Sequence, residues 1–319
     1  MDKKLKVLVT GATGFVGRYL VTFLESTGYD VRCAVRNRTT AVAYSSRDVA
    51  VIGEINDKTD WRTALSDVDV VIHLAGRAHV MNEKSADAES LYDAVNVNGT
   101  ANLLDQLQGT KVKRLIYLSS VKVNGERTKP GERFTEESKC NPEDIYGRSK
   151  LKAEQAIWAK RAEAKIEYVV IRPPLVYGPN VKGNLATLVN VLRKGVPVPL
   201  GMINNKRSLV SLQNLSRFIE VCIWHPDAAN QVFLISDDED VSTTYLVEQI
   251  GKALDKCILN FPVPVAALRA LGVLVGRGGA MDRLTGTLQV DISKGKKMLG
   301  WTPAISLGKG LELMIREQV

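Results

Sequence analysis

The chain has 319 residues, of which 45% are hydrophobic and 24% are charged, so we expect a folded protein with a full core rather than disorder. Its formal net charge of +8 suits a nucleic acid, an anionic membrane face or a small anionic ligand, because all three favour a positive field. Long Lys/Arg runs are absent and aromatic residues make up 6%, which favours a small phosphate-bearing ligand over nucleic acid.

Short apolar runs alternate with longer helical patterns through the first half of the chain. Continuous apolar runs predict strands that are buried on both faces of a parallel sheet, with helices on either side. The predicted strands are 6–11, 31–36, 49–53, 68–76, 114–120 and 167–174. The predicted helices between them are 15–27, 88–107 and 145–163. The expected fold class is therefore α/β, with a doubly wound parallel sheet in residues 1–174.

The regular alternation stops after residue 174. Helical patterns follow at 184–195, 209–223, 243–254 and 307–318, which predict a smaller, mostly helical lobe over 175–319, with the option that some segments return to the first domain. The longest apolar stretch, 261–276, carries Arg269 and is too short for a bilayer span. We predict a buried helix there rather than membrane contact, and no membrane span.

The N-terminal apolar run is too short for the core of a signal peptide and is expected to form the first strand. Cys33, Cys140, Cys222 and Cys257 are scattered, with neither metal nor redox spacing, which suits a reducing compartment. We therefore expect a cytoplasmic protein with no metal site.

Three glycines, Gly11, Gly14 and Gly17, stand between the first predicted strand and the first predicted helix. Glycine permits a tight turn and a close backbone approach, and the helix N-terminus offers N–H groups to a diphosphate. Spaced glycines also mark ordinary turns, so their place between strand and helix carries the prediction. We expect this loop to bind a dinucleotide.

Tyr146 and Lys150 stand four residues apart in a predicted helix, which puts both on one face. An adjacent ammonium favours the phenolate, so the pair can carry a proton. Such a spacing also arises by chance on a solvated helix face. Ser119 and Ser120 end a predicted buried strand, and a hydroxyl there can reach the same substrate oxygen, which favours the catalytic interpretation.

The order of motifs resembles that of extended short-chain dehydrogenase/reductases. These motifs are TGATGFVG, VIHLAG, NVNGT, LSSVKVNG, YGRSK, RPPLVYGP, RSLVSLQNL and DISKGKKMLGW. The resemblance covers nearly the whole chain and indicates the NAD-dependent epimerase/dehydratase family, with a Rossmann sheet. It implies a catalytic triad of Ser120, Tyr146 and Lys150, in which Lys150 also holds the nicotinamide ribose. Ser120 is preferred to Ser119 because the family's hydroxyl residue lies five before the glycine that matches Gly125.

The resemblance also implies binding residues and partners. Around the cofactor these are Gly11, Thr13, Gly14, Phe15, Val16, Gly17, Arg36, Arg38, Glu54, Ile55, Leu74, Ala75, Gly76, Asn96, Lys150 and Pro173. Around a UDP-sugar substrate they are Lys122, Asn184, Arg207 and Arg283. Arg207 matches an arginine of the family that binds the diphosphate. A guanidinium group suits this role because its N–H donors can contact two phosphates at once. The alternatives are that Arg207 is a surface charge, that Asn184 is a helix cap, and that Lys122 and His79 lie on exposed loops. A homodimer through the helices holding 96–107 and 146–161 is also implied.

The predicted second strand is followed by no carboxylate, whereas NAD enzymes carry one about twenty residues beyond the glycine loop. Arg36 and Arg38 instead offer guanidinium groups to a 2′-phosphate, and Arg18 adds to that field. NAD(P)H is therefore the expected cofactor, with NADP slightly favoured over NAD. The alternative is that Arg36 and Arg38 lie on a plain surface loop. Glu54 is expected at the adenine and does not replace the ribose carboxylate.

Val121 and Lys122 follow Ser120, where dehydratases of this branch carry a carboxylate, so 4,6-dehydration is disfavoured. Leu175 stands where many 4-epimerases have an asparagine. A cofactor site that accepts NADPH favours reduction of the C4 ketone of a UDP-linked 4-keto-6-deoxy-N-acetylhexosamine. The product of this reaction would serve the synthesis of a surface polysaccharide. The alternative is a 4-epimerase with bound NAD that acts on a UDP-hexose or UDP-N-acetylhexosamine. A dehydrogenase of a sterol-like or phenolic ketone and an NAD(P)-sensing regulator without catalysis are less favoured.

Overall fold

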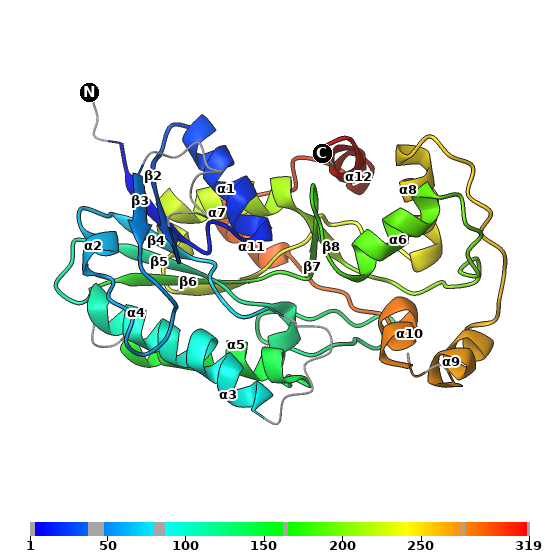
Figure 1. The fold of residues 1–319 in the computed structure, drawn as a ribbon, viewed down its shortest axis with the longest axis horizontal. Helices are drawn as coiled ribbons and strands as arrows, with labels where there is room; N and C mark the ends of the chain where they lie inside the picture. The colour runs from blue at the N-terminus through cyan, green and yellow to red at the C-terminus, as the bar shows by residue number, and fades with distance from the viewer. Residues whose placement is uncertain are drawn as a thin grey trace.

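The computed structural model describes residues 4–37, 48–78, 87–161, 165–274, 276 and 278–317. Its centre is a seven-stranded sheet in the order β3-β2-β1-β4-β5-β6-β9, in which every neighbouring pair runs parallel (Figure 1). The strands are β1 (Lys6–Thr10), β2 (Asp30–Val35), β3 (Asp48–Val51), β4 (Val70–His73), β5 (Arg114–Leu118), β6 (Glu167–Arg172) and β9 (Gln231–Leu234). The strand order reverses direction between β1 and β4, where ligands of doubly wound sheets bind.

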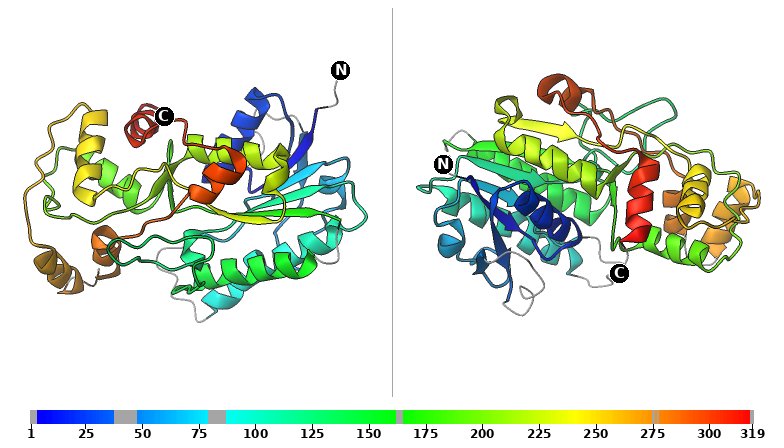
Figure 2. Two further views of the ribbon diagram at one scale, coloured as in Figure 1. Left: turned by 180° about the vertical axis from the view of Figure 1, so that it is seen from behind. Right: turned by 90° about the horizontal axis from the view of Figure 1, so that it is seen from above.

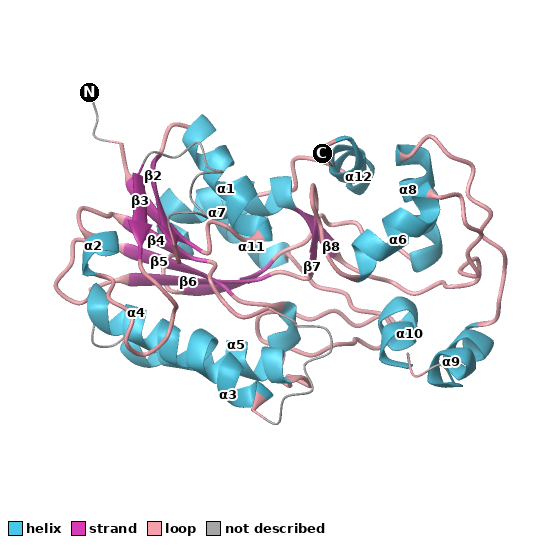
Figure 3. Ribbon diagram, in the orientation of Figure 1, coloured by secondary structure: helices cyan, strands magenta, loops and turns pink. Residues whose placement is uncertain are grey.

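Helices cover both faces of the sheet, as Figures 1 and 3 show. One face carries α1 (Phe15–Ser26), α7 (Leu212–Trp224) and α11 (Ser293–Leu299). The other face carries α2 (Arg62–Leu65), α3 (Ala88–Tyr92), α4 (Gly99–Leu107) and α5 (Ile145–Lys160). The predicted doubly wound parallel sheet is confirmed.

Alternation within each strand explains why the strands read as continuous apolar runs. In β1, Val7 and Val9 pack into the core on the α1 side, whereas Leu8 packs into the core on the α5 side. In β6, Val169 packs into the core on the α1 side and Val170 packs into the core on the α5 side. Because both faces are covered, strand positions of this kind are apolar unless a hydrogen-bond partner is buried beside them, as for Thr10 and His73.

The C-terminal part is smaller and mostly helical, as predicted. It contains a two-stranded parallel sheet of β7 (Leu175–Tyr177) and β8 (Leu209–Ser211). Its helices are α6 (Asn184–Arg193), α8 (Thr243–Ala253), α9 (Val265–Leu274), α10 (Gly278–Thr285) and α12 (Leu307–Arg316). The views in Figure 2 show these helices beside one end of the main sheet. The domain boundary at residue 174 stays a prediction, and β9 joins the main sheet although it follows that residue.

Two predicted helices differ in detail from the structure. Residues 209–211 form β8, and α7 begins only at Leu212, because Ser211 accepts a hydrogen bond from the N–H of Asn214 and acts as the N-cap. The predicted helix 88–107 contains a π-helical segment, Asp93–Asn98, between α3 and α4. Short-range periodicity does not distinguish these states from an α-helix.

The prediction of a buried helix at 261–276 is wrong. The helix α9 exists, but its buried residues are Leu268 and Gly272, and Leu274 is 83% exposed. The apolar composition predicted burial, yet the helix lies at the outer end of the C-terminal part, where few described residues can cover it (Figure 1). Within the described ranges, no helix is both long and apolar enough to cross a membrane.

Candidate active site

The glycine loop joins β1 to α1 at the edge of the sheet where the strands end. Gly11 has a φ of +66°, and a Cβ on it would lie 2.7 Å from the backbone nitrogen of Ala75. A Cβ on Gly17 would lie 2.1 Å from the carbonyl oxygen of Gly11. Gly14 is the N-cap of α1 and offers no side-chain cap to its N–H groups. The loop therefore presents bare backbone and a helix N-terminus, which fits the diphosphate of a dinucleotide.

A cleft of about 630 Å³ runs from this loop to the C-terminal part. The predicted site residues that line it are Gly11, Gly14, Phe15, Val16, Gly17, Leu74, Gly76, Ser120, Lys122, Tyr146, Lys150, Pro173, Asn184, Arg207 and Arg283. The structure thus brings together residues from four strand ends and from α6 and α10. Thr13, Arg36, Glu54, Ile55, Ala75 and Asn96 are described but are not among the lining residues.

Ser120 and Tyr146 meet where β5 ends and α5 begins. Ser120 is the N-cap of the short 3₁₀ segment Val121–Val123, and its Oγ accepts a hydrogen bond from the N–H of Lys122 at 3.2 Å. Tyr146 lies in the first turn of α5, whose N-cap Asp144 accepts from the N–H of Gly147 at 2.7 Å. Burial raises the pKa of Tyr146, as does the charge of Asp144, while a hydrogen bond from Ser120 lowers it. Together these effects favour the protonated phenol over the phenolate.

Lys150 lies one turn further along α5. Its Nζ donates to the carbonyl oxygen of Leu118 at 2.8 Å and lies 6.0 Å from the centroid of the Tyr146 ring. Burial lowers the pKa of Lys150 to about 8, although the charge of Glu154 acts in the opposite direction. The predicted face of α5 therefore does carry a phenol and an ammonium into one cleft.

The two candidate serines have different surroundings. Ser119 is buried and donates to Glu154, which in turn forms a buried ion pair with Arg172. Both serines line the cleft, and Ser120 is the one that forms a side-chain hydrogen bond with Tyr146. Because the Ser119 hydroxyl donates to Glu154 whereas the Ser120 hydroxyl contacts Tyr146, this geometry favours Ser120 as the hydroxyl that acts with Tyr146.

Asn96 lies beneath the cleft rather than in its wall. Its Oδ1 accepts from the N–H of Arg77 at 2.7 Å, and its Nδ2 donates to the Oγ of Ser149 at 2.9 Å. A Cβ on Gly76 would lie 3.0 Å from that Oδ1, and the N–H of Ala75 donates to Thr10 at 3.1 Å. Asn96 therefore fixes the segment after β4 against α5 and positions the cleft wall.

The predicted residues for the adenosine end lie outside the cleft. Arg36 and Glu54 follow β2 and β3, and their side chains are 64% and 73% exposed with 3.4 Å between guanidinium and carboxylate. Arg38 and His79 lie outside the described residues. Ile55 packs against Gly99, where a Cβ would lie 2.5 Å from its Cγ2. Arg36 thus has a carboxylate beside it, which the sequence pattern did not indicate.

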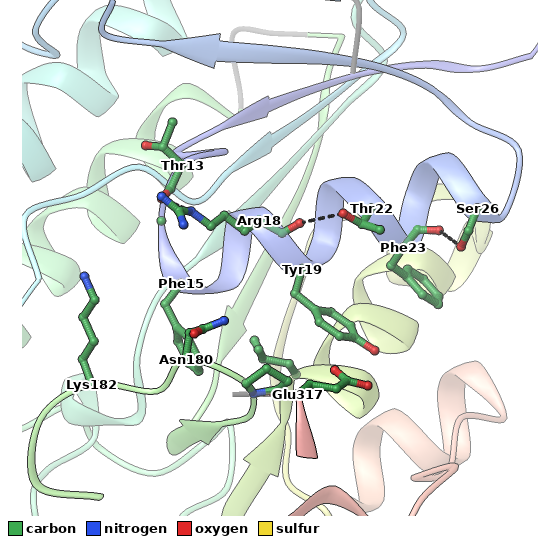
Figure 4. Close-up of a pocket in the computed structure, with 13 residues that line it drawn as sticks. Thr13, Phe15, Arg18, Tyr19, Thr22, Phe23, Ser26, Asn180, Lys182 and Glu317 are labelled. Carbon is green, nitrogen blue, oxygen red and sulfur yellow. Dashed lines mark hydrogen bonds between the residues drawn. The ribbon is translucent and has the colours of Figure 1, made fainter. Parts of the chain in front are cut away.

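A second groove of about 490 Å³ follows α1 beside the glycine loop (Figure 4). Thr13 lines this groove, and the Nε of Arg18 donates to its carbonyl oxygen at 3.0 Å. Lys182 approaches from the chain after β7 and lines both this groove and the cleft. Two cations therefore flank the glycine loop, which favours an anionic ligand there.

The predicted substrate residues gather at the other end of the cleft. One terminal guanidinium nitrogen of Arg207 donates to the carbonyl oxygens of Arg283 at 3.0 Å and of Gly286 at 3.2 Å. Burial lowers the pKa of Arg207 and repulsion from Arg283 adds to this, while Glu126 raises it. Asn184 is the first residue of α6, next to Gly183 at its N-cap.

Lys122 is a half-buried residue rather than the exposed loop residue given as an alternative. Its Nζ donates to Glu126 at 2.9 Å and to Asp144. Both carboxylates raise the pKa of Lys122 against the effect of its burial. The lysine therefore stays charged and holds the loop after β5 against the start of α5.

Several cleft residues were not anticipated from the sequence. They include Arg77, Glu126, Lys182, Thr243, Leu246 and Leu284. Lys182 stands between two recognised motifs, and Glu126 directly follows Gly125, so their places next to motifs could have indicated that they line the cleft. Arg77 directly follows the VIHLAG motif after β4, whereas Thr243, Leu246 and Leu284 come from segments without a motif, and only the folding of the C-terminal part against the sheet brings these three to the cleft.

The parallel sheet, the glycine loop and the grouping of Ser120, Tyr146 and Lys150 define an extended short-chain dehydrogenase/reductase. The chain belongs to the NAD-dependent epimerase/dehydratase family, whose model matches residues 7–236.

Relatives of known name cover nearly the whole chain. A UDP-glucose 4-epimerase of Vibrio cholerae is 47% identical over 98% of this chain and 95% of its own length. An N-acetyl-alpha-D-glucosaminyl-diphospho-ditrans,octacis-undecaprenol 4-epimerase of Escherichia coli O157:H7 is 27% identical over 96% and 93%. The fold is also that of the UDP-glucuronic acid 4-epimerase of Bacillus cereus solved with NAD, with a TM-score of 0.78, 22% identity and 98% of both chains covered.

Proposed function

We propose that this enzyme is an NAD-dependent 4-epimerase of a UDP-linked hexose or N-acetylhexosamine. The observation that carries the proposal is the grouping of Ser120, Tyr146 and Lys150 midway along a cleft that has the glycine loop at one end and Arg207 at the other. The similarity to a protein named UDP-glucose 4-epimerase supports this reaction over the C4 reduction that the sequence pattern favoured.

The protein groups supply proton transfer and orientation. When bound, NAD would accept a hydride from C4 of the sugar, return it to the opposite face, and add a positive charge near the phenol. As the phenolate, Tyr146 would take the proton from the C4 hydroxyl while the hydride leaves C4 and give it back when the hydride returns, and Ser120 holds the same oxygen. Because burial raises the pKa of Tyr146, the proton transfer depends on nearby positive charge, which Lys150 supplies in part.

The diphosphate of the substrate is assigned to the end of the cleft that is lined by Arg207, Arg283 and Asn184. Backbone carbonyls fix one edge of the Arg207 guanidinium, so the group is held in place before a ligand arrives. A fixed guanidinium suits two neighbouring phosphates better than a point charge. We therefore propose that Arg207 sets the affinity for the diphosphate.

One observation favours reduction with NADPH as a second function. No carboxylate follows β2, and Arg36 stands there instead. Against NADPH, Glu54 lies 3.4 Å from Arg36 and would repel a 2′-phosphate. We therefore propose NAD as the cofactor, and reduction of a UDP-linked 4-keto sugar stays a prediction. The homodimer and the cytoplasmic location stay predictions as well, the second supported by four cysteines that form no disulfide in the described part of the chain.

Cofactor accounting on the purified protein distinguishes the two functions. We expect denaturation to release NAD in a near one-to-one ratio with the chain, and we expect UDP-glucose or UDP-N-acetylglucosamine to be inverted at C4 without net consumption of cofactor. A protein that purifies empty and consumes stoichiometric NADPH with a UDP-linked 4-keto sugar would contradict the epimerase and establish the reductase.

Arg207→Ala is expected to raise KM for the UDP-sugar by roughly tenfold to a hundredfold, because a charge-assisted hydrogen bond contributes about 1.5–3 kcal/mol. The kcat should change much less, since the diphosphate is bound in both ground and transition states. Steady-state kinetics with free UDP as a competitive inhibitor measures both effects. Arg217→Ala, on α7, is the control, and an unchanged KM in Arg207→Ala would remove Arg207 from the substrate site.

A further inference from the structure

The helix α9 exposes apolar side chains that a water-facing helix normally buries. Its exposed fractions are 57% at Leu271, 70% at Val273 and 83% at Leu274. Arg269 is the charged residue of the helix, and its Nε donates to Thr285 on α10 at 3.0 Å. The outer side of α9 is thus apolar, which is the composition of a helix that is covered in its working state.

Two segments that precede α9 in the chain also expose apolar side chains. Leu259 is 65% exposed, Phe261 40%, Val196 46% and Met202 51%. Backbone hydrogen bonds join the two segments, because the N–H of Val198 donates to Leu259 and the N–H of Gly201 donates to Phe261. We call these residues together with Leu271, Val273 and Leu274 the distal apolar surface. Figure 1 and the left view of Figure 2 both show α9 and the chain leading into it at the end of the molecule away from the sheet.

The charge around the distal apolar surface is positive. Arg193, Lys194, Lys252 and Lys256 are exposed there, and Lys256 donates to the carbonyl oxygen of Arg193. The segments 184–206 and 256–281 contain no Asp or Glu, and the carboxylates directly next to the second segment are Asp255 and Asp282, of which Asp282 lies 4.0 Å from the Nε of Arg269. A second copy of this surface would bring the same positive charge and be repelled. An anionic surface instead complements both the apolar side chains and the lysines.

We propose that the distal apolar surface docks on an anionic lipid bilayer. With 10 residues, α9 is about 15 Å long, so it lies in the interface and does not span the bilayer. Leu271, Val273 and Leu274 enter the headgroup boundary, and the basic residues contact the anionic headgroups. Because Arg283 on α10 lines the cleft, docking holds the diphosphate end of the cleft close to the membrane surface.

Flotation with lipid vesicles tests this proposal. The full chain is mixed with vesicles of phosphatidylglycerol and phosphatidylethanolamine, or of phosphatidylcholine alone, at low and at high salt. We expect binding to the anionic vesicles that weakens with salt, and a loss of about tenfold or more in the double substitution Leu271→Ser and Leu274→Ser. Trp224→Ser is the matched control, because Trp224 is 57% exposed at the end of α7, beside the main sheet.

Circular dichroism and thermal melting establish that each variant is folded, and neither these nor flotation require turnover. Failure of the wild type to float, or equal flotation of the double variant, would overturn the proposal. An equal loss in Trp224→Ser would overturn it too, since the effect would then be general hydrophobicity. If light scattering shows that the double substitution dissociates an oligomer without altering flotation, the surface is a contact between copies instead.

Discussion

Tyr146→Phe is expected to lower kcat by roughly two to four orders of magnitude, which is the usual loss when a general acid–base group is removed. The substitution deletes one oxygen and keeps the ring, whose edge packs against Tyr92 at 6.3 Å between centroids. Proton transfer at the C4 oxygen is lost, while the glycine loop and Arg207 are untouched. Retained NAD and the Kd for UDP should therefore match the wild type, and equilibrium binding together with single-turnover kinetics measures both.

Tyr92→Phe is the matched control for this prediction. It removes a nearby phenol oxygen that donates to the carbonyl of Ala78 at 3.0 Å, so it tests loss of a hydroxyl without loss of the proposed proton carrier. We expect its kcat to stay within about fivefold of the wild type, since a neutral hydrogen bond contributes about 1 kcal/mol. Turnover by Tyr146→Phe at a comparable level would show that another group carries the proton.

The sheet and the glycine loop could be predicted because their signals are local. Val7, Leu8 and Val9 are buried on alternate faces, so a strand of this kind has to be apolar throughout. Gly11 and Gly17 allow no Cβ because backbone atoms of the loop or of the segment after β4 occupy the space. Tyr146 and Lys150 share a face because α5 is a regular helix.

The remaining features depend on contacts between distant segments. Glu54 is paired with Arg36 because β3 lies beside β2, and no local sequence pattern predicts a carboxylate beside Arg36. Arg207 is fixed by carbonyls of residues 283 and 286, which lie about eighty positions later in the chain, so its orientation is set only by tertiary packing. The exposure of α9 was missed for the same reason, since composition does not reveal what surrounds a helix.

Gly17→Ala is expected to abolish retention of NAD, and with it turnover. The added Cβ would lie 2.1 Å from the carbonyl oxygen of Gly11 and 2.8 Å from Cα of Ala12, so the first turn of α1 has to move away from the loop. That movement separates the helix N-terminus from the diphosphate it is proposed to bind. We expect the affinity for NAD to fall by about a hundredfold or more, as measured by calorimetry on protein stripped of nucleotide.

Gly308→Ala separates this steric effect from the general cost of replacing a helical glycine. Gly308 lies in the first turn of α12, and the nearest atom to an added Cβ is the Gln249 side chain at 3.9 Å. Its affinity for NAD should be unchanged, and its melting temperature should stay level or rise slightly, because alanine favours a helix by about 1 kcal/mol over glycine. If Gly17→Ala does not fold, Gly14→Ala is the milder test, since its Cβ would approach the Gly11 oxygen to 3.1 Å. Folded Gly17→Ala or Gly14→Ala protein that still purifies with a full complement of NAD would show that the cofactor does not depend on this close packing.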